Sequence, residues 1–176
     1  TVADPRVRWS TDLFTFFAPG YWGLPADLDY DGWTAAVHAE PRPYFDRMLD
    51  EAKEAGLDAV ELADDPANWE RALETFGSPE AFKAELDRRG LLLSSSYHSG
   101  WVVIGRTLAD PGFRAAAEAE IRAHARFLAA AGGDHIVLGS IERALGTGPG
   151  FDAVDPALLA AVAELLNGFG AIAKEE

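Results

Sequence analysis

The sequence alternates between short apolar runs and longer segments with helical periodicity, and this alternation limits the fold more than any other feature. The apolar runs lie at residues 13–18, 57–62, 91–97 and 135–139. Runs of this length without polar alternation are typical of parallel strands that are covered on both faces. Each run is followed by a helical pattern, so the sequence predicts an α/β fold built from about four β/α units.

Start and stop signals mark the predicted helices. The helices are expected at residues 41–55, 69–76, 79–90, about 110–132 and from 156 onwards. Ser78 can cap the third of these with Pro79 at its first position, and Gly90 suits its end. Residues 21–40, which are rich in Gly, Pro and aromatic side chains, are expected to form a loop.

Repeated β/α units close either as a doubly wound sheet or as a barrel of the TIM type. The doubly wound alternative requires a G-x-G-x-x-G turn after the first strand, and residues 18–23 do not match it. A parallel (β/α) barrel of TIM type is therefore preferred, with residues 1–12 as an N-terminal tail and residues 13–176 as its first half.

The barrel prediction does not explain how the sheet closes into a barrel. A complete barrel takes about 250 residues, and 176 residues supply about four units. Four strands cannot close alone, and their free edges favour pairing with another chain. A half-barrel that dimerises, one of two subunits and a truncated barrel that lacks its C-terminal half all remain open.

Composition removes several classes of function. The chain has no cysteine, which excludes disulfides, thiolate nucleophiles and cysteine-based zinc sites. Its formal net charge of -14 argues against a nucleic-acid partner, because phosphates must be neutralised by Lys and Arg. No apolar run is expected to approach the roughly 20 residues that span a bilayer, and the N-terminus lacks a signal-peptide core. We therefore expect a cytoplasmic protein without a membrane partner.

Two polar residues at predicted strand ends are the first candidates for a site. Parallel β/α folds gather their sites at the carboxyl ends of the strands. Glu61 lies between Val60 and Leu62, where an unpaired carboxylate is costly to bury, so it is expected to bind substrate hydroxyls. A structural bond to backbone or Arg is the alternative. His98 directly follows the third run and is the predicted catalytic residue, with a purely structural histidine as the alternative.

The remaining candidates are predicted to contact substrate. They are Tyr21, Trp22, Trp101 and Glu142. Aromatic faces such as those of Tyr21 and Trp22 pack well on sugar C–H surfaces, but they equally suit plain packing at the mouth of a barrel. Glu142 is explained as well by a surface salt bridge with Arg143. No metal ligand is assigned, and only His98 is kept as a candidate for one.

Four segments in this order resemble the xylose isomerase-like barrel superfamily. They read FFAPGYWG at 16–23, AGLDAVEL at 55–62, SSSYHSGW at 94–101 and AAAGGDHIVLG at 129–139. This superfamily includes sugar phosphate isomerases and epimerases, inosose dehydratases and AP endonucleases. The resemblance extends over nearly the whole chain from Leu13 onwards.

The resemblance implies a metal-dependent isomerase, epimerase or dehydratase that acts on a sugar or cyclitol. In the sugar epimerases of this family two Glu, one Asp and one His from later strands hold a divalent ion such as Mn, Mg, Zn or Co. Such strands would follow Glu176, so no family ligand is carried over. Glu61 and His98 match positions that face the pocket, and in the endonuclease branch a histidine at the position of His98 binds metal. The acidic charge speaks against that branch.

A second class of function competes with the enzyme. The chain is also compatible with a non-catalytic half-barrel that binds a small polyhydroxylated ligand or a partner chain.

Overall fold

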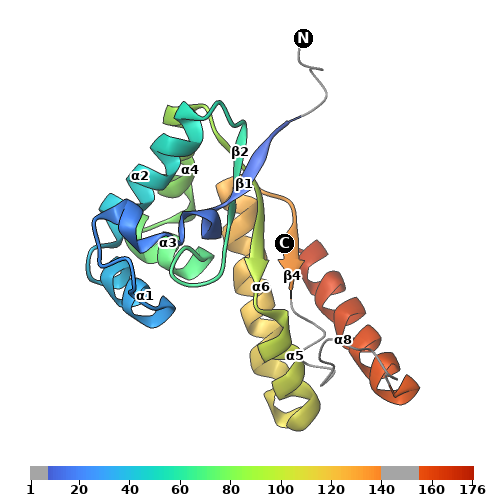
Figure 1. The fold of residues 1–176 in the computed structure, drawn as a ribbon. Helices are drawn as coiled ribbons and strands as arrows, with labels where there is room; N and C mark the ends of the chain where they lie inside the picture. Colours follow the sequence, from blue (N-terminus) through green and yellow to red (C-terminus); the bar gives the residue numbers. More distant parts are fainter. Residues whose placement is uncertain (1–7, 140–154) are drawn as a thin grey trace.

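The computed structural model describes residues 8–139 and 155–176, and its strands form one parallel sheet (Figure 1). The strands are β1 (Ser10–Asp12), β2 (Ala59–Leu62), β3 (Leu92–His98) and β4 (Ile136–Leu138). They are hydrogen-bonded in the order β1-β2-β3-β4, with one register shift between Val60 and Glu61. The predicted α/β class with a parallel sheet is confirmed.

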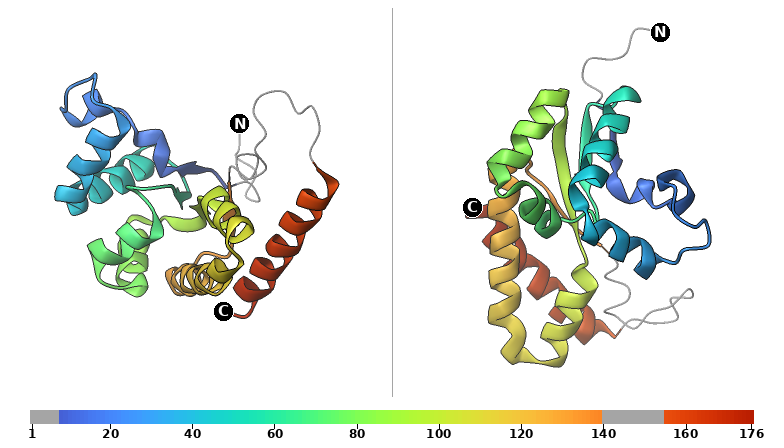
Figure 2. Two further views of the ribbon diagram at one scale, coloured as in Figure 1. Left: turned by 90° about the horizontal axis from the view of Figure 1, so that it is seen from below. Right: turned by 90° about the vertical axis from the view of Figure 1, so that its left-hand side faces the viewer.

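Helices separate consecutive strands and lie along one side of the sheet (Figure 2). They are α1 (Tyr30–Ala39), α2 (Pro41–Glu54), α3 (Trp69–Phe76), α4 (Pro79–Arg89), α5 (Gly100–Ala109), α6 (Arg114–Ala131) and α8 (Pro156–Lys174). Crossovers between parallel strands are right-handed. When the spatial order of the strands equals their order in the sequence, right-handed crossovers place every connecting helix on the same face of the sheet.

The core fills the space between the sheet and this helical layer. Val60 and Leu62 of β2 are fully buried there against Phe45 of α2 and Phe82 of α4. A second apolar cluster joins α5, α6 and α8, with Ile121 and Phe169 among its members. Among the described residues no helix covers the opposite face of the sheet, where Leu92 and Val137 are exposed.

The predicted first strand at residues 13–18 is wrong. The strand is Ser10–Asp12, within the segment expected to be an N-terminal tail, and the apolar run begins with a 3-10 turn over Leu13–Phe16. The carboxylate of Asp12 accepts a hydrogen bond of 2.7 Å from the Phe14 N–H. This cap turns the chain as the strand ends, and the buried side chain of Leu13 anchors the turn in the core.

Two helices were also missed. The predicted loop at residues 21–40 contains α1, which Asp29 caps by accepting from the Gly32 N–H at 2.9 Å. Helix α5 starts directly after β3 without a side-chain cap. The predicted ends of α4 are confirmed: Ser78 caps it, and Gly90 follows it with φ of 69°, a left-handed conformation that favours glycine. The helix predicted from about residue 110 begins instead at Arg114, after a 3-10 turn over Pro111–Phe113.

Helix α8 corrects the expectation that no apolar run approaches the length of a membrane span. Its 19 residues are long and apolar enough to cross a bilayer by length and composition alone. One such helix is weak evidence for a membrane span, because a mostly buried core helix of a soluble protein meets the same criterion. In α8 only 17% of the apolar window is buried, with Val162, Leu165 and Phe169 packed against the neighbouring helices. The sequence reading missed this because Glu164 and two glycines interrupt the apolar pattern.

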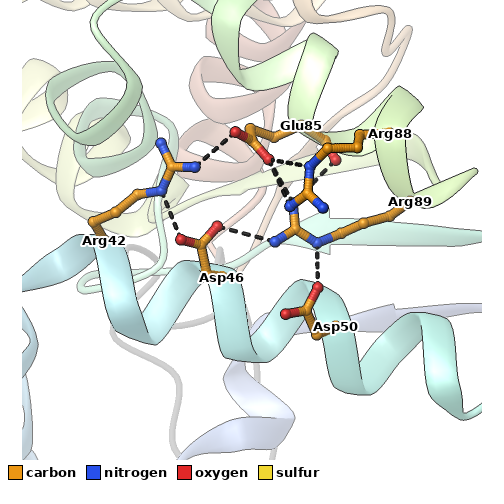
Figure 3. Close-up of polar contacts among 6 residues, drawn as sticks. All are labelled: Arg42, Asp46, Asp50, Glu85, Arg88 and Arg89. Carbon is orange, nitrogen blue, oxygen red and sulfur yellow. Dashed lines mark hydrogen bonds and ion pairs between the residues drawn. The ribbon is translucent and has the colours of Figure 1, made fainter.

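A network of charged side chains joins α2 to α4 (Figure 3). The side chain of Arg89 is only 4% exposed, and its guanidinium donates to Asp46 at 3.0 Å, Asp50 at 2.6 Å and Glu85 at 2.7 Å. Arg42 donates from α2 to Asp46 and Glu85. Because three carboxylates engage one buried guanidinium, the network fixes how the two helices pack beside the sheet.

Replacing Arg89 by Met should lower the free energy of unfolding by about 2 kcal/mol, since three carboxylates lose their shared donor. Urea denaturation measures the change. Arg88→Met is the matched control, because Arg88 also bonds Glu85 but is 61% exposed, and it should change the free energy by less than about 0.5 kcal/mol. Equal effects of the two variants would show that the buried network does not hold the helices.

The same network predicts how stability depends on pH. Hydrogen bonds, the largest effect being that from Arg42, lower the pKa of Glu85 from 4.5 to about 2. The stabilisation by Glu85 is therefore complete above pH 4.5 and is lost as the pH falls towards 2. In urea titrations the destabilisation caused by Glu85→Gln should be largest at neutral pH and shrink below pH 4.5. A deficit that stays constant down to pH 2 would contradict this.

Candidate functional site

A cavity of about 200 Å³ lies at the carboxyl ends of β2 and β3. It is bounded by the loop after β2, the start of α3, the end of β3, and helices α5 and α6. Its polar lining includes Asp64, Asn68, Glu70, Tyr97, His98, Ser99, Arg106 and Glu120. This is the edge at which parallel β/α folds gather functional groups.

Asp64 ties the loop after β2 to the end of β3. One of its carboxylate oxygens accepts from the Ser99 hydroxyl at 2.6 Å, and the other accepts from the Asp65 N–H at 3.0 Å. Asn68 then caps α3 by accepting from the Arg71 N–H at 2.8 Å. These bonds place Glu70, in the first turn of α3, on the wall of the cavity.

Glu70 and Glu120 are two carboxylates in one cavity. Burial is the main cause that raises the pKa of Glu70, and repulsion from Glu120 raises it further. The side chain of Glu70 is thereby adapted to hold a proton more readily than an ordinary glutamate does.

His98 is buried and hydrogen-bonded to Glu120. Its side chain is 6% exposed, and its Nε2 lies 3.0 Å from Glu120 Oε1. Its Nδ1 is buried without a hydrogen-bond partner in the described part of the chain. With a proton on Nε2, His98 donates this hydrogen bond to Glu120 Oε1. Glu120 is 39% exposed, so it is the more accessible member of this pair.

His124, on α6, packs against the ring of His98. Its ring stacks between those of Trp69 and His98, with centroid distances of 5.2 and 5.5 Å, and its Nε2 lies 2.7 Å from the Ser96 hydroxyl oxygen. Burial is the main cause that lowers the pKa of His124 to about 3, with a smaller effect of His98. A neutral His124 therefore fixes the orientation of the His98 ring.

Arg106 is the cation of the cavity. It is exposed on α5, and its guanidinium lies 4.0 Å from the centroid of the Phe113 ring. It makes no ion pair with any residue in the described ranges 8–139 and 155–176.

Among the predicted site residues, only His98 lies in this cavity with a described side chain. Glu61 accepts from the Ser95 hydroxyl on the sheet face that no described helix covers. Val60 and Leu62 point into the core, so strand alternation turns Glu61 away from it. It is not among the residues that line the cavity.

Tyr21 and Trp22 pack on α2 and do not line the cavity. Trp22 Nε1 donates to the Phe16 carbonyl at 2.8 Å, and its ring lies 4.8 Å from that of Tyr44. The guanidinium of Arg47 lies 3.9 Å from the ring centroid of Tyr21. The plain packing alternative fits these contacts. The side chain of Trp101, and all of Glu142, lie outside the described residues.

Sequence reasoning missed Asp64, Glu70 and Glu120. Asp64 follows the end of β2 closely, so the strand-end rule that selected Glu61 applied to Asp64 as well, although Asp64 was not selected. Glu70 and Glu120 belong to helices, and Glu120 stands 22 residues from His98 in the sequence. No spacing signal in the sequence pairs Glu120 with His98.

The described residues do not form a metal site. No group of three or more His, Asp or Glu side chains within residues 8–139 and 155–176 is arranged to hold a metal ion. The acidic groups of the cavity bond to Ser99, His98 and Asn68 instead.

Comparison with known proteins adds no assignment. No protein-family model matches the chain, and a search of curated proteins finds no significant match.

His124 should stay neutral in the folded protein well below the ordinary histidine pKa of 6.5. Its imidazole NMR shift should therefore not move between pH 8 and pH 5, while in urea the same ring should titrate near 6.5. Since only the unfolded state gains this proton, the stability contributed by a neutral His124 should fall as the pH drops below 6.5. Titration of the folded ring above pH 5 would contradict the buried stack.

Proposed function

We propose that this chain supplies part of the active site of an isomerase, epimerase or dehydratase that acts on a sugar or cyclitol. The observation that carries the proposal is the His98–Glu120 pair in a cavity at the carboxyl edge of a parallel sheet. These reactions begin with removal of a proton from the carbon next to a carbonyl, which needs a positioned base and acid.

The described groups suit this proton transfer. Glu120 is partly exposed and its charge is fixed in place by the hydrogen bond from His98, so it is the proposed base. Glu70, with its raised pKa, is the proposed acid for the substrate oxygen. His98 was predicted as the catalytic residue; because it is buried behind Glu120, its proposed role is to position the base.

A barrel of the TIM type is the proposed architecture. Sequential strand order with helices on one face supports it, because a doubly wound sheet reverses its strand order and carries helices on both faces. The uncovered face, with Glu61 and Ser95 on it, would then line the interior of the barrel. Further β/α units or a second chain would complete the sheet at the free edges of β1 and β4.

The proposed cofactor, a divalent metal ion, finds no ligand set among the described residues. We therefore derive no step through a metal. In the family that the sequence resembles, the metal ligands come from later strands, so a completed barrel is where the ion would be held.

Hydrogen exchange tests the proposed chemistry directly. The chain is incubated in D₂O with a panel of ketoses and inososes, with and without Mn²⁺ or Mg²⁺, and loss of the C–H signal next to the carbonyl is followed by NMR. We expect exchange above the protein-free rate, reduced about 100-fold or more in Glu120→Gln.

Glu118→Gln is the matched control. Glu118 lies two residues away on the same helix, and among the described residues it pairs only with the exposed Arg114, so its amide should leave exchange unchanged. Binding of a polyol without exchange would instead favour the non-catalytic half-barrel. Absence of both binding and exchange would reject the proposed function.

A further inference from the structure

The outer strands of the sheet, β1 and β4, each have one edge without a partner in the described part of the chain. Strand β1 pairs with β2 alone, and β4 pairs with β3 alone. Proteins protect such edges with charged side chains, proline or a covering segment, because an open edge pairs readily with another chain. Strand β4 consists of Ile136, Val137 and Leu138, so neither a charge nor a proline protects it.

On β1 the backbone groups of Ser10 and Asp12 point to the free edge. The Trp9 carbonyl accepts from the Ala59 N–H at 3.1 Å, so the backbone of Trp9 faces β2. Successive residues of a strand direct their N–H and C=O groups to opposite edges. Ser10 and Asp12 therefore direct theirs away from β2, where a further strand would pair.

On β4 the backbone groups of Ile136 and Leu138 point to the free edge. The His135 carbonyl accepts from the Ser96 N–H at 3.0 Å, so the backbone of His135 faces β3. By the same alternation Ile136 and Leu138 face away from β3. Strands β1 and β4 are three residues long, so the two free edges match in length.

Opposite charges stand at the amino ends of the two outer strands. Arg8 is exposed just before β1. Asp134 and His135, which bond to each other, are 79% and 73% exposed just before β4. Parallel pairing of a β4 edge with a β1 edge brings the two amino ends together, so that Asp134 meets Arg8. Antiparallel pairing of the same edges would place them at opposite ends.

Exposed apolar side chains gather at the same two ends of the sheet. Trp9 beside β1 is 65% exposed, and Val137 of β4 is 40% exposed. Helix α8 lies at the β4 end of the sheet (Figure 1), packs on α5 and α6, and exposes 52% of Leu159. Apolar surface that continues across an open edge is typical of an interface between chains.

We propose that the partner at these edges is a second copy of this chain, with each β4 pairing in parallel with the β1 of the other copy. Each copy supplies four strands, and about eight strands close a barrel whose interior side chains can fill. One two-fold axis forms both pairings at once and leaves no free edge. Pairing β4 with β4 would leave both β1 edges open.

This inference rests on the barrel architecture of the proposed function and names the chain that completes it. The sheet face that no described helix covers, with Glu61 and Ser95 on it, becomes the interior shared by both copies. The flank of α8 that carries Leu159 then lies beside the helices that follow β1 of the partner copy. All eight carboxyl ends meet at one mouth.

Sedimentation equilibrium of the 176-residue chain over a range of concentrations tests the association. The net charge of -14 repels a second copy, so the experiment is run at about 0.15 M salt, where the Debye length is about 8 Å. We expect a reversible dimer of twice the chain mass of 18.9 kDa.

Ser10→Pro tests whether the β1 edge forms the interface. Proline removes the outward N–H of Ser10, which a free edge tolerates and a paired strand does not. The dimer Kd should rise about tenfold or more. Ser10→Ala is the matched control, because it loses the hydroxyl contact with Ser94 but keeps the N–H, and its Kd should stay within about threefold. Circular dichroism shows that both variants are folded.

A charge exchange tests which edges meet. Arg8→Asp and Asp134→Arg should each weaken the dimer about fivefold, because each places like charges together at both pairings. The double variant restores opposite charges and should return the Kd to within about twofold of the original chain. The double variant also shows that neither substitution acts by unfolding the protein.

The other outcomes overturn the inference. They are a monomer at every concentration, a dimer whose Kd is unchanged by Ser10→Pro, and a double variant that associates no better than the single ones. The proposed function is decided separately by C–H exchange. A monomer that still exchanges substrate protons, with loss in Glu120→Gln, leaves the proposed function standing, and a dimer without exchange overturns the function alone.

Discussion

The handedness of the crossover connections is the constraint on which the rest of the structure depends. Parallel strands cannot be joined by tight turns, so each connection between β1, β2, β3 and β4 must travel back along the sheet, and a right-handed crossover places it on a fixed side. With the strands in sequential order, every helix is sent to one face. One face of the sheet is thus packed, the other is open, and all carboxyl ends meet at one edge.

The cavity at that edge depends on polar groups buried in the helical layer. Ser96 and His98 are buried and point towards α6, where apolar side chains would pack without any need for partners. Their partners are His124 and Glu120 on α6, and stacking on Trp69 fixes His124. Such groups are costly to bury and contribute less to stability than an apolar core. Their presence therefore favours a role in positioning the Glu120 carboxylate.

Local signals in the sequence predicted much of the fold. Ser78 and Gly90 bound α4 through their own backbone preferences, which act within a few residues. The first strand was predicted too far along the chain, because the apolar run at residues 13–18 was taken as the strand and the capping ability of Asp12 was overlooked. At the site, the strand-end rule found His98, but Glu120 reaches it from another element through tertiary packing. Pairing of that kind is set by the fold and leaves no periodicity in the sequence.

The sheet separates two carboxylates that sequence reasoning treats alike. Glu61 lies on the open face, held by Ser95, whereas Glu120 lies on the helical side, held by His98. A ligand that contacts both must lie across the ends of β2 and β3, because the backbone between the faces is closed by hydrogen bonds. Asp64 stands at this crossing point and is fixed there by Ser99. The Asp64–Ser99 bond therefore joins the ends of β2 and β3 at the place where the open face and the cavity come closest in the chain.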